Sequence, residues 1–496
     1  MNADKLNAWG AAPEMLLLAV AGLVMLLDLF IGARRRGVVL AVALVGLLLV
    51  AVLCGQGLAQ DAVGYAFNGM YVADPMANLL KIVACICAAA TMLYSEAYGR
   101  DRAMWHGELF TLTLFATLGI LVMISANNLL VIYLGLELQA LSLYALAALR
   151  RDESRATEAA MKYFVLGAMA SGFLLYGMSM LYGATGTLDI NELAHRIASG
   201  RVPGIGAVAL GTVFVVAGLA FKLGAVPFHM WVPDVYHGAP TPVTMLIGSA
   251  PKLGAFAMSV RLLVEGLSPV ASDWGQMVTV LAVGSLVVGN VTAIAQTNLK
   301  RMLGYSTIAQ MGFMLLAMRA GLGAGSTAAT AASWSAALFY VVTYALTTLG
   351  TFGIILLLSR QGFESEEIAD LRGLNRRSPW YAFVMLVLMF SLAGVPPAVG
   401  FYAKLVVLQA LIEGGGVPGI VLAVFAVLFS LVGAFYYLRV VKTMYFDEPA
   451  DGSPIVATQA TRVALSLNAV TVLVLGLLPQ YLLGLCGAAM LRTLGG

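Results

Sequence analysis

The sequence has few charged residues. Asp, Glu, Lys and Arg make up 11% of its 496 residues, hydrophobic residues make up 61%, and the mean hydropathy is +0.91. A chain with so few polar residues cannot cover the surface of a soluble globule, so the composition indicates a membrane protein. The net charge of +3 gives no reason to expect a nucleic-acid partner.

Cysteine is also scarce. The four cysteines, Cys54, Cys85, Cys87 and Cys486, form no CxxC pair, which argues against an iron–sulfur or zinc centre. No glycine-rich nucleotide loop follows a predicted strand. We therefore expect no cofactor and no metal on this chain, and any redox chemistry on other chains. The first residues lack the cationic segment of a secretory signal, so the first apolar run is expected to be retained as a span.

Long apolar runs dominate what is present. Windows of about 20 apolar residues predict fourteen spans, near 14–31, 37–54, 76–95, 108–124, 127–149, 160–182, 206–230, 242–264, 276–296, 302–318, 333–358, 380–412, 418–440 and 463–490. The runs are continuous rather than alternating, which favours helices over a β-barrel. The expected fold is an all-α polytopic membrane protein without a soluble domain.

The basic residues indicate an orientation. Eighteen Lys and Arg residues fall on the side of the Arg34–Arg36 loop, six fall on the other side with Lys5 and Arg201 among them, and four lie within spans. Because cytoplasmic loops carry an excess of Lys and Arg, this asymmetry predicts that both termini lie outside the cytoplasm.

A few ionisable residues interrupt the apolar runs. Glu137, Lys81, Lys222, Lys252 and Lys404 all fall within predicted spans. A charge at the centre of a spanning helix costs roughly 2.5–3.5 kcal/mol on insertion scales, so a functional role is the default hypothesis for each.

Glu137 lies in the stretch "LGLELQALSLYALAAL", about ten residues or roughly 15 Å into the fifth span. Tyr133, Leu141 and Tyr144 share its helix face, so we expect the carboxylate to face other helices. The alternative is a structural carboxylate that a neighbouring hydroxyl satisfies.

Two spans carry helix-breaking residues beside a lysine. In the seventh, Pro227 and Gly224 predict a break near 224–228, next to Lys222. The twelfth, 380–412, would extend about 50 Å as one helix, so it is expected to break at "AGVPPAVG", shortly before Lys404. Broken helices expose backbone dipoles and admit water, as in transporter ion sites, although a break can also serve packing alone.

The eighth and eleventh spans add polar groups. Pro251 loosens the eighth span, where Lys252 shares a face with Ser249 and Ser259. The eleventh span has a face rich in hydroxyls, formed by Tyr340, Thr343, Tyr344, Thr347, Thr348 and Thr351. These hydroxyls either hold a chain of water molecules or bond back to their own helix.

Other ionisable residues are weaker candidates. Lys81 is near a span boundary beside Asp74 and is expected either to reach outward or to be structural. His229, Asp234 and His237 lie at the cytoplasmic end of the seventh span, where proton uptake is one interpretation and a metal site is not favoured. Asp28, six residues before Arg34, is expected at the membrane interface.

Together these groups suggest a proton path. A Glu137–Lys222 pair would act as a switch, Lys252 as a relay and Lys404 as the exit-side carrier. His229, His237, Tyr133, Tyr144, Tyr340 and Thr347 are candidates for uptake or relay.

Three motifs, "FKLGAVPFHMWVPDVYHGAPTPVTMLIGSAPKLGAF", "QTNLKRMLGYSTIAQMGF" and "LAGVPPAVGFYAKL", resemble the antiporter-like subunits of respiratory complex I (NADH:quinone oxidoreductase) and of related multisubunit cation/proton antiporters. The resemblance spans about residues 100–445. It implies proton translocation by the residues at the family's positions, here Glu137, Lys222, Lys252 and Lys404. Lys404, where M-type subunits are expected to carry glutamate, and a chain end directly after the last span make it similar to the N-type subunits.

The resemblance also implies an organisation and partners. It predicts two inverted five-helix repeats with broken helices seven and twelve, and hence segments 1–105, 106–266 (first repeat), 267–446 (second repeat) and 447–496. The expected partners are the other membrane-arm subunits in a bacterial inner membrane, with NADH, FMN, iron–sulfur clusters and quinone on partner subunits. A subunit of a cation/proton antiporter or membrane-bound hydrogenase, and a scaffold whose buried charges only fix packing, are the alternatives.

Overall fold

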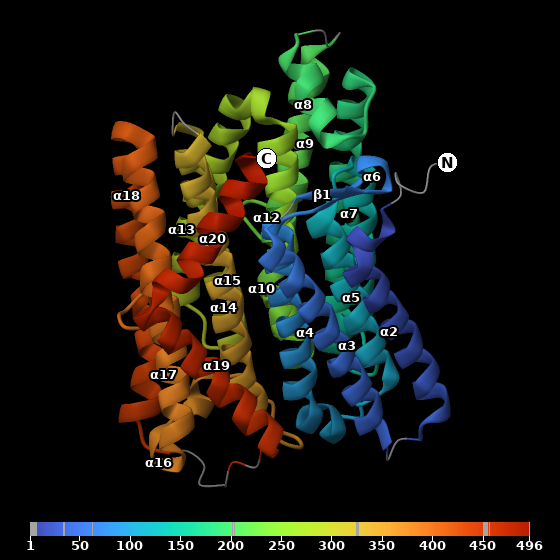
Figure 1. Cartoon of the computed structure of the whole chain (residues 1–496). Helices are drawn as coiled ribbons and strands as arrows, with labels where there is room; N and C mark the ends of the chain where they lie inside the picture. The colour runs from blue at the N-terminus through green and yellow to red at the C-terminus, as the bar shows by residue number, and fades with distance from the viewer. Residues whose placement is uncertain are drawn as a thin grey trace.

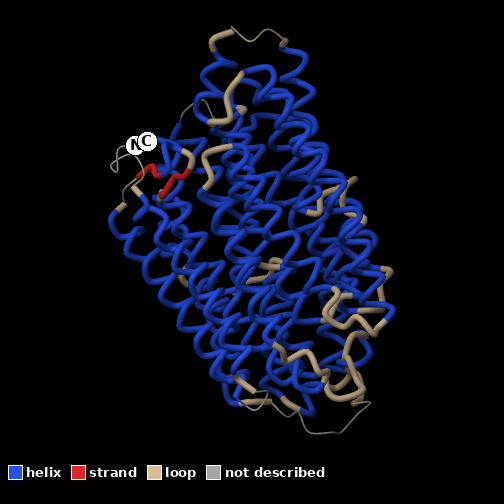
Figure 2. Tube along the Cα trace, turned by 90° about the vertical axis from the view of Figure 1, so that its right-hand side faces the viewer, coloured by secondary structure: helices blue, strands red, loops and turns tan. Residues whose placement is uncertain are grey.

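The chain forms an elongated bundle of helices that run between two ends (Figures 1 and 2). The computed structural model describes residues 7–32, 35–61, 63–200, 202, 204–323, 327–449, 455 and 457–495. The basic residues Lys5, Arg34 and Arg201, which entered the predicted orientation, lie outside this part of the chain. Helix dominates, and a small hairpin is the strand structure among the described residues.

The first part of the bundle contains these elements: η1 Ala8–Ala11, α2 Ala12–Phe30, α3 Arg36–Gln60, β1 Gly64–Ala66, η3 Phe67–Gly69, β2 Tyr71–Ala73, α4 Pro75–Asp101, α5 Gly107–Ser125, α6 Leu129–Ala147, α7 Ser154–Thr185, α8 Ile190–Ala198, α9 Ile205–Leu223, α10 Trp231–Gly238, α11 Thr241–Gly248, α12 Ala250–Ser259 and the π-helix η4 Val260–Gly266.

The second part contains η5 Ser268–Val270, α13 Ala271–Ile294, α14 Leu299–Ala320, η6 Gly321–Gly323, α15 Thr327–Leu358, η7 Ile368–Leu371, α16 Leu374–Arg377, α17 Pro379–Ala393, α18 Val399–Phe446, α19 Gln459–Leu477 and α20 Pro479–Gly495.

The all-helical membrane fold is confirmed, but the count of fourteen spans stays a prediction. Within the described residues, 12 helical segments are long and apolar enough to cross a membrane. α14 is not among them because polar side chains such as Gln310 lower its hydropathy, and α17 has only 15 residues. α18 counts once, although the backbone of Gly416 is not helical and divides it.

Gly416 marks a sharp turn inside α18. A Cβ atom at Gly419 would lie 2.1 Å from the carbonyl oxygen of Leu411, eight residues earlier. In a continuous helix these residues would be about 12 Å apart, so the chain turns back on itself here. α18 is therefore two packed helices, as the predicted spans 380–412 and 418–440 required.

Both expected helix breaks are present. α9 ends at Leu223 and α10 begins at Trp231, while α17 ends at Ala393 and α18 begins at Val399. Gly224 and Gly394 end α9 and α17 in the left-handed conformation, with φ of 80° and 84°, which glycine adopts without steric cost. The proline that follows each glycine cannot continue the helix.

The bundle has two distinct ends. We call the end that carries the N and C marks in Figures 1 and 2 the terminal face; the β1–β2 hairpin and α8 lie on this side. The hairpin is antiparallel and pairs Tyr65 with Val72. We call the opposite end, where α16 lies, the loop face. It also carries the connections α4–α5, α6–α7 and α15–α17.

The centre of the bundle is the segment from α11 to η4. Its helices pack against α4, α5, α9 and α15, and its apolar window is entirely buried. The chain places Lys252 in this segment, so the most buried helix of the bundle also carries a lysine.

Candidate functional site

Lys252 binds the C-terminal end of the first broken helix, α9. It is 0% exposed, and its Nζ donates hydrogen bonds to the carbonyl oxygens of Lys222 (3.1 Å) and Leu223 (2.9 Å) in the last turn of α9. The carbonyls at a helix C-terminus lack partners within the helix and carry partial negative charge. The break in α9 therefore supplies Lys252 with acceptors that an unbroken helix would not offer.

Lys222 and Glu137 lie near each other and near Lys252. Each of the pairs Glu137–Lys222 and Lys222–Lys252 interacts electrostatically. Glu137 and Lys222 form no ion pair among those that join described residues, and Glu137 Oε1 is buried without a hydrogen-bond partner. Glu137 and Lys222, the expected pair, are therefore close to each other but not in direct contact.

The helix face that carries Glu137 is partly buried. Tyr133 and Glu137 are half-buried, and Leu141 on the same face is 55% exposed. α6 packs mainly on α5 and α7, so this face meets other helices at Tyr144 but not at Leu141. Only Tyr144, at the end of the stripe, is buried.

Lys404 binds the C-terminal end of the second broken helix, α17, in the same way. Its Nζ donates to the carbonyl oxygen of Ala393, the last residue of α17 (2.9 Å), and to Ser430 Oγ (2.9 Å). The ammonium also lies 5.0 Å from the ring centre of Phe313. Lys404 is 9% exposed, and its hydrogen bonds go to α17 and α18 whereas those of Lys252 go to α9, so these two lysines form separate centres.

At each break a second side chain also donates a hydrogen bond to a carbonyl oxygen at the end of the broken helix. Trp231 Nε1 donates to Phe221 O (3.0 Å) at the end of α9, and Gln310 Nε2 donates to Leu392 O (2.9 Å) at the end of α17. Sequence reasoning named none of Trp231, Gln310 and Ser430 as site residues. The signal for Gln310 was a lone amide within the apolar part of "QTNLKRMLGYSTIAQMGF".

The hydroxyl-rich face of α15 combines both predicted roles. Thr343, Thr347 and Thr351 donate to carbonyls of their own helix. Thr343 and Thr347 also line a cavity of about 20 Å³, together with Gln310, Tyr340, Tyr344, Ser391, Leu392, Gly400 and Ala403. A polar cavity of this size has room for about one water molecule. Lys404 does not line the cavity, although Leu392 and Ala403, the residues before Ala393 and Lys404 in the chain, do.

Hydrogen bonds join this cavity into a network. Tyr340 donates its hydroxyl to Gln310 Oε1, and Tyr344 donates to Thr307 Oγ1 (2.8 Å). Thr347 Oγ1 lies 3.2 Å from Ser391 Oγ on α17. The structure thus brings the predicted residues Tyr340 and Thr347 to the second break.

The remaining candidates, Tyr144, His229 and His237, lie in different parts of the bundle. Tyr144 is buried, and its hydroxyl lies against Gly167 of α7 without a hydrogen-bond partner. His229 lies within the α9–α10 break beside the exposed Pro227 and Met230. His237, at the end of α10, lines a pocket at the loop face. Within the described residues, no group of three or more His, Cys, Asp or Glu side chains could hold a metal ion.

Lys81 does not reach outward, contrary to one of the two expectations for it. It is 1% exposed, its Nζ lies 2.6 Å from Glu14 Oε1, and it donates to the Tyr71 hydroxyl (2.7 Å). Glu14 lies on α2 and Tyr71 on β2, so Lys81 is a structural ion pair that ties the hairpin to the first helices. The sequence offered no sign of this pairing, because Glu14 is far from Lys81 in the chain.

Other buried charges are also paired. Arg261 in η4 bonds Asp74 Oδ2 and Glu265 Oε1, both at 2.6 Å, on the terminal-face side. At the loop face, Lys300 is 1% exposed and lies 2.8 Å from Glu366 Oε1. Asp28, expected at the membrane interface, lies 3.5 Å from Arg36.

The loop face also shows how pairing changes ionisation. Burial alone would raise the pKa of Glu364, but hydrogen bonds from Arg102, Tyr98 and Arg150 outweigh it and hold that pKa below its ordinary value. The pKa of Asp234 is likewise lowered, because Lys162 and Arg301 outweigh its burial. Burial lowers the pKa of His237, against the opposing charge of Glu366.

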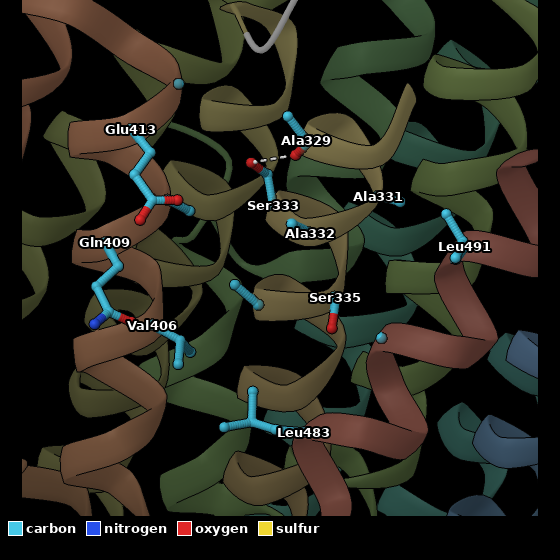
Figure 3. Close-up of a pocket in the computed structure, with 14 residues that line it drawn as sticks. Ala329, Ala331, Ala332, Ser333, Ser335, Val406, Gln409, Glu413, Leu483 and Leu491 are labelled. Carbon is cyan, nitrogen blue, oxygen red and sulfur yellow. Dashed lines mark hydrogen bonds between the residues drawn. The ribbon is translucent and has the colours of Figure 1, made fainter. Parts of the chain in front are cut away.

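A larger cavity elsewhere carries little chemistry. It measures about 440 Å³ and lies between α15, α18 and α20. Figure 3 shows Gln409 and Glu413 on its α18 side, facing Ser333 and Ser335 of α15. Alanine, glycine and aliphatic side chains form most of the remaining lining, and Glu413 is its one titratable residue.

Comparison with known proteins now identifies the chain. The family described as "NADH:quinone oxidoreductase/Mrp antiporter, TM" matches residues 126–430, which include Glu137, Lys222, Lys252 and Lys404. The chain belongs to this family. Two of its relatives, each named NADH-quinone oxidoreductase subunit N, are 57% identical to it. The protein of Herminiimonas arsenicoxydans aligns over 99% of both chains, and that of Polaromonas naphthalenivorans over 98% of both.

Solved structures agree with this assignment. A chain of respiratory complex I from Thermus thermophilus is 31% identical, with a TM-score of 0.80 over 96% of this chain and 100% of that one. A chain of an archaeal membrane-bound sulfane sulfur reductase is 26% identical, with a TM-score of 0.83. A chain of the Mrp complex from Dietzia, at 21% identity and a TM-score of 0.83, shares the fold.

Proposed function

We propose that this chain is an N-type, proton-translocating subunit in the membrane arm of NADH:quinone oxidoreductase. It couples electron transfer from NADH to quinone, which takes place on other subunits, to proton transport across a bacterial inner membrane. NADH, FMN, iron–sulfur clusters and quinone are held by those partners. Close similarity to subunit N relatives over the full chain supports this assignment.

One observation carries the proposed mechanism. Among the described buried lysines, Lys81 and Lys300 form ion pairs with carboxylates, whereas Lys252 and Lys404 are held by neutral oxygen atoms alone. Removing one charge of a buried ion pair leaves the other uncompensated, at a cost of several kcal/mol. A lysine that is hydrogen-bonded only to neutral oxygen atoms can lose its proton without leaving a buried carboxylate charge uncompensated. Lys252 and Lys404 are therefore suited to exchange protons, and Lys81 and Lys300 are suited to stay charged.

Glu137 and Lys222 would control this exchange. A change in the distance between them would strengthen or weaken the charge that Lys222 presents to Lys252, because the three groups already interact electrostatically. Lys252 would pass the proton on, and the cavity lined by Tyr340 and Thr347 would hold the water that leads to Lys404. This assigns the switch to α6 and α9, the relay to α12 and the exit-side carrier to α18.

We further propose that the loop face is cytoplasmic and that both termini lie on the periplasmic side. Arg102, Arg150, Arg155 and Lys300 lie at the loop face, in keeping with the excess of basic residues in cytoplasmic loops. Labelling of an introduced cysteine near residue 448 by a membrane-impermeant reagent, in intact cells and in inverted vesicles, tests this orientation.

The direct test of function is proton transport by the assembled complex. In Lys404→Met, the neutral side chain cannot carry a proton, so NADH-driven proton transport should fall well below that of wild type. Lys442→Met, which removes an exposed lysine paired with Asp447, is the matched control and should transport normally. Normal transport in Lys404→Met would refute the proposed role.

A cation/proton antiporter or membrane-bound hydrogenase subunit is the second candidate. The shared fold of the Mrp and sulfane sulfur reductase chains favours it. Purification of the chain with its native partners separates the two functions. Peripheral subunits that contain flavin and iron–sulfur clusters and oxidise NADH support the first candidate, and membrane subunits alone support the antiporter.

A further inference from the structure

An aromatic ring lies beside each lysine that binds the end of a broken helix. Lys252 Nζ is 5.2 Å from the ring centre of Trp231 on α10, and Lys404 Nζ is 5.0 Å from that of Phe313 on α14. The face of an aromatic ring carries negative charge density, so it attracts an ammonium group within about 6 Å. An uncharged amine lacks this attraction. Each ring therefore favours the protonated lysine over the neutral one.

Trp231 is fixed against the end of α9. It is 3% exposed, and its ring stacks on those of Tyr163 (4.8 Å between ring centres) and Phe221 (5.5 Å). Its Nε1 donates to the carbonyl oxygen of Phe221, in the same helical turn whose other carbonyls bind Lys252. The indole and the ammonium are therefore held by one helix end, which keeps the ring beside the charge.

At the second break, two residues of α14 divide the contacts that Trp231 makes at the first. Phe313 supplies the ring, and Gln310, one turn earlier, donates to the carbonyl oxygen of Leu392 at the end of α17. The Phe313 ring stacks on that of Tyr340 (6.0 Å between ring centres), whose hydroxyl bonds to Gln310. Different residues thus build the same arrangement at both breaks, with a lysine and a side-chain N–H on the helix end and a ring beside the ammonium.

Lys81 provides the contrast. Its ammonium lies 4.9 Å from the ring centre of Tyr71 but also 2.6 Å from Glu14 Oε1. A carboxylate carries a full negative charge, so Glu14 fixes the charge of Lys81 whatever the ring contributes. Among the described residues, Lys252 and Lys404 bond to neutral oxygen atoms instead, and a ring is a weaker partner than a carboxylate. A ring can therefore favour the protonated lysine and still allow its proton to leave.

We propose that Trp231 and Phe313 are positioning residues for proton transport, whose rings face the ammonium groups of Lys252 and Lys404 in place of a carboxylate and keep each lysine protonated until its proton is transferred. This inference rests on the proposed function and deepens it, because it names the residues that set how firmly the two lysines hold their protons. Without its ring, a lysine would lose its proton at a lower pH, so transport would fail earlier as the solution becomes alkaline.

Other ionisable side chains surround the two lysines. They are Lys222 of α9, Glu137 of α6, Tyr163 of α7 and Cys87 of α4 around Lys252, and Tyr340 and Tyr344 of α15 and Tyr437 of α18 around Lys404. At the first break, a change of pH therefore acts on Lys222 and Glu137 as well as on Lys252. The phenols at the second break ordinarily ionise only near about pH 10, so the second break gives the simpler test.

Fluorination of Phe313 tests the ring with little change of shape. In Phe313→trifluorophenylalanine, the fluorine atoms withdraw charge from the ring face, so the ammonium is held less firmly. The number of protons transported per NADH oxidised by the assembled complex should begin to fall at a pH about 0.5–1 unit lower than in wild type. Phe110→trifluorophenylalanine, at a buried ring of α5 that packs on Trp105, is the matched control and should keep the wild-type profile. A Phe313 variant with the wild-type profile, or with a loss that is equal at every pH, would overturn the proposal.

Two substitutions at Trp231 provide the test at the first break. Trp231→Phe keeps a ring and loses the N–H, whereas Trp231→Leu loses both. The loss of protons per NADH in Trp231→Leu should be several-fold larger at alkaline than at mildly acidic pH, since acid restores the protonated Lys252. Trp231→Phe should lie between Trp231→Leu and wild type at alkaline pH. Equal losses in the two variants at every pH would show that the indole serves packing alone, and the proposal would be wrong.

The Lys404→Met variant separates this inference from the proposed function. If Lys404→Met transports protons normally, the proposed function itself fails. If Lys404→Met loses transport while the fluorinated Phe313 variant keeps the wild-type profile, only the role of the ring fails.

Discussion

At the scale of single residues, the neighbours of each buried charge determine what it can do. Lys81 is held by Glu14 and Tyr71, and Lys252 is held by two carbonyl oxygens. The proposed function therefore makes the same side chain a fixed charge in α4 and an exchangeable one in α12. Burial alone does not distinguish them, because both are almost completely inaccessible.

Gly167 provides a residue-scale prediction about packing on the α6 stripe. A Cβ atom there would lie 1.9 Å from the Tyr144 hydroxyl, and the Tyr144 ring packs edge-on against Tyr163. Gly167→Ala should destabilise the purified complex by about 1–3 kcal/mol, the usual cost of overpacking. Gly172→Ala in the same helix meets no atom within 4 Å and should gain up to about 1 kcal/mol from helix propensity. Equal melting temperatures for the two variants would contradict the close contact.

Glu364 provides a prediction about acidity. Its pKa is lowered in the folded chain, so its ion pairs contribute stability above the unfolded pKa, and this contribution is lost as the pH falls through the folded pKa. Acidification from pH 7 to about pH 4 should therefore lower the melting temperature of wild type more than that of Glu364→Gln. A parallel decline in both proteins would show that these pairs add no pH-dependent stability.

Residue types could be predicted from the sequence, but partners could not. Glu137, Lys222, Lys252 and Lys404 were identified because a charge in an apolar run is costly wherever it points. Whether a charge was paired depended on contacts distant in sequence, such as Lys81 with Glu14 and Arg261 with Asp74. For the same reason the exposure of Leu141 on the α6 stripe was not foreseen.

At the scale of elements, the two broken helices supply the acceptors for the lysines. The breaks could be predicted well, because glycine in the left-handed region and proline act locally. The interruption between α11 and α12 at Ser249 agrees with the loosening expected from Pro251. The π-helix η4 was not foreseen, since no local residue requires it.

Gly394 tests the link between a break and its lysine. It has φ of 84°, and a Cβ atom there would lie 2.8 Å from Lys404 Cδ. Gly394→Ala should cost about 1–2 kcal/mol for the left-handed backbone and displace Lys404 from the Ala393 carbonyl, so proton transport should fall. Gly415→Ala, next to the α18 turn, meets no atom and should leave transport unchanged. If Gly394→Ala transports protons normally, the function of Lys404 does not depend on the helix break.

At the scale of the whole molecule, buried ion pairs join segments that are distant in sequence. Arg261 connects η4 to α4 through Asp74 and approaches the carbonyl of Ile124 at the end of α5. It therefore fixes the end of the central helix that carries Lys252. These ties hold the end of the central segment against α4 and α5.

Removing Arg261 should be costly. Arg261→Gln leaves the carboxylates of Asp74 and Glu265 without their shared cation, and loss of one partner of a buried ion pair costs about 3–5 kcal/mol. We expect a lower melting temperature and less assembled complex. The double variant Arg261→Gln, Asp74→Asn should recover part of the loss. If it is no more stable than the single variant, Arg261 does not act by compensating Asp74.

The central claim is that buried lysines held by carbonyls carry protons, whereas those held by carboxylates do not. The most direct measurement is the number of protons transported per NADH oxidised, in vesicles that contain assembled complex with either Lys252→Met or Lys81→Met. The account predicts a lower ratio for Lys252→Met and an unchanged ratio for Lys81→Met, whose cost falls on assembly. An unchanged ratio for Lys252→Met, or equal losses in both variants, would contradict it.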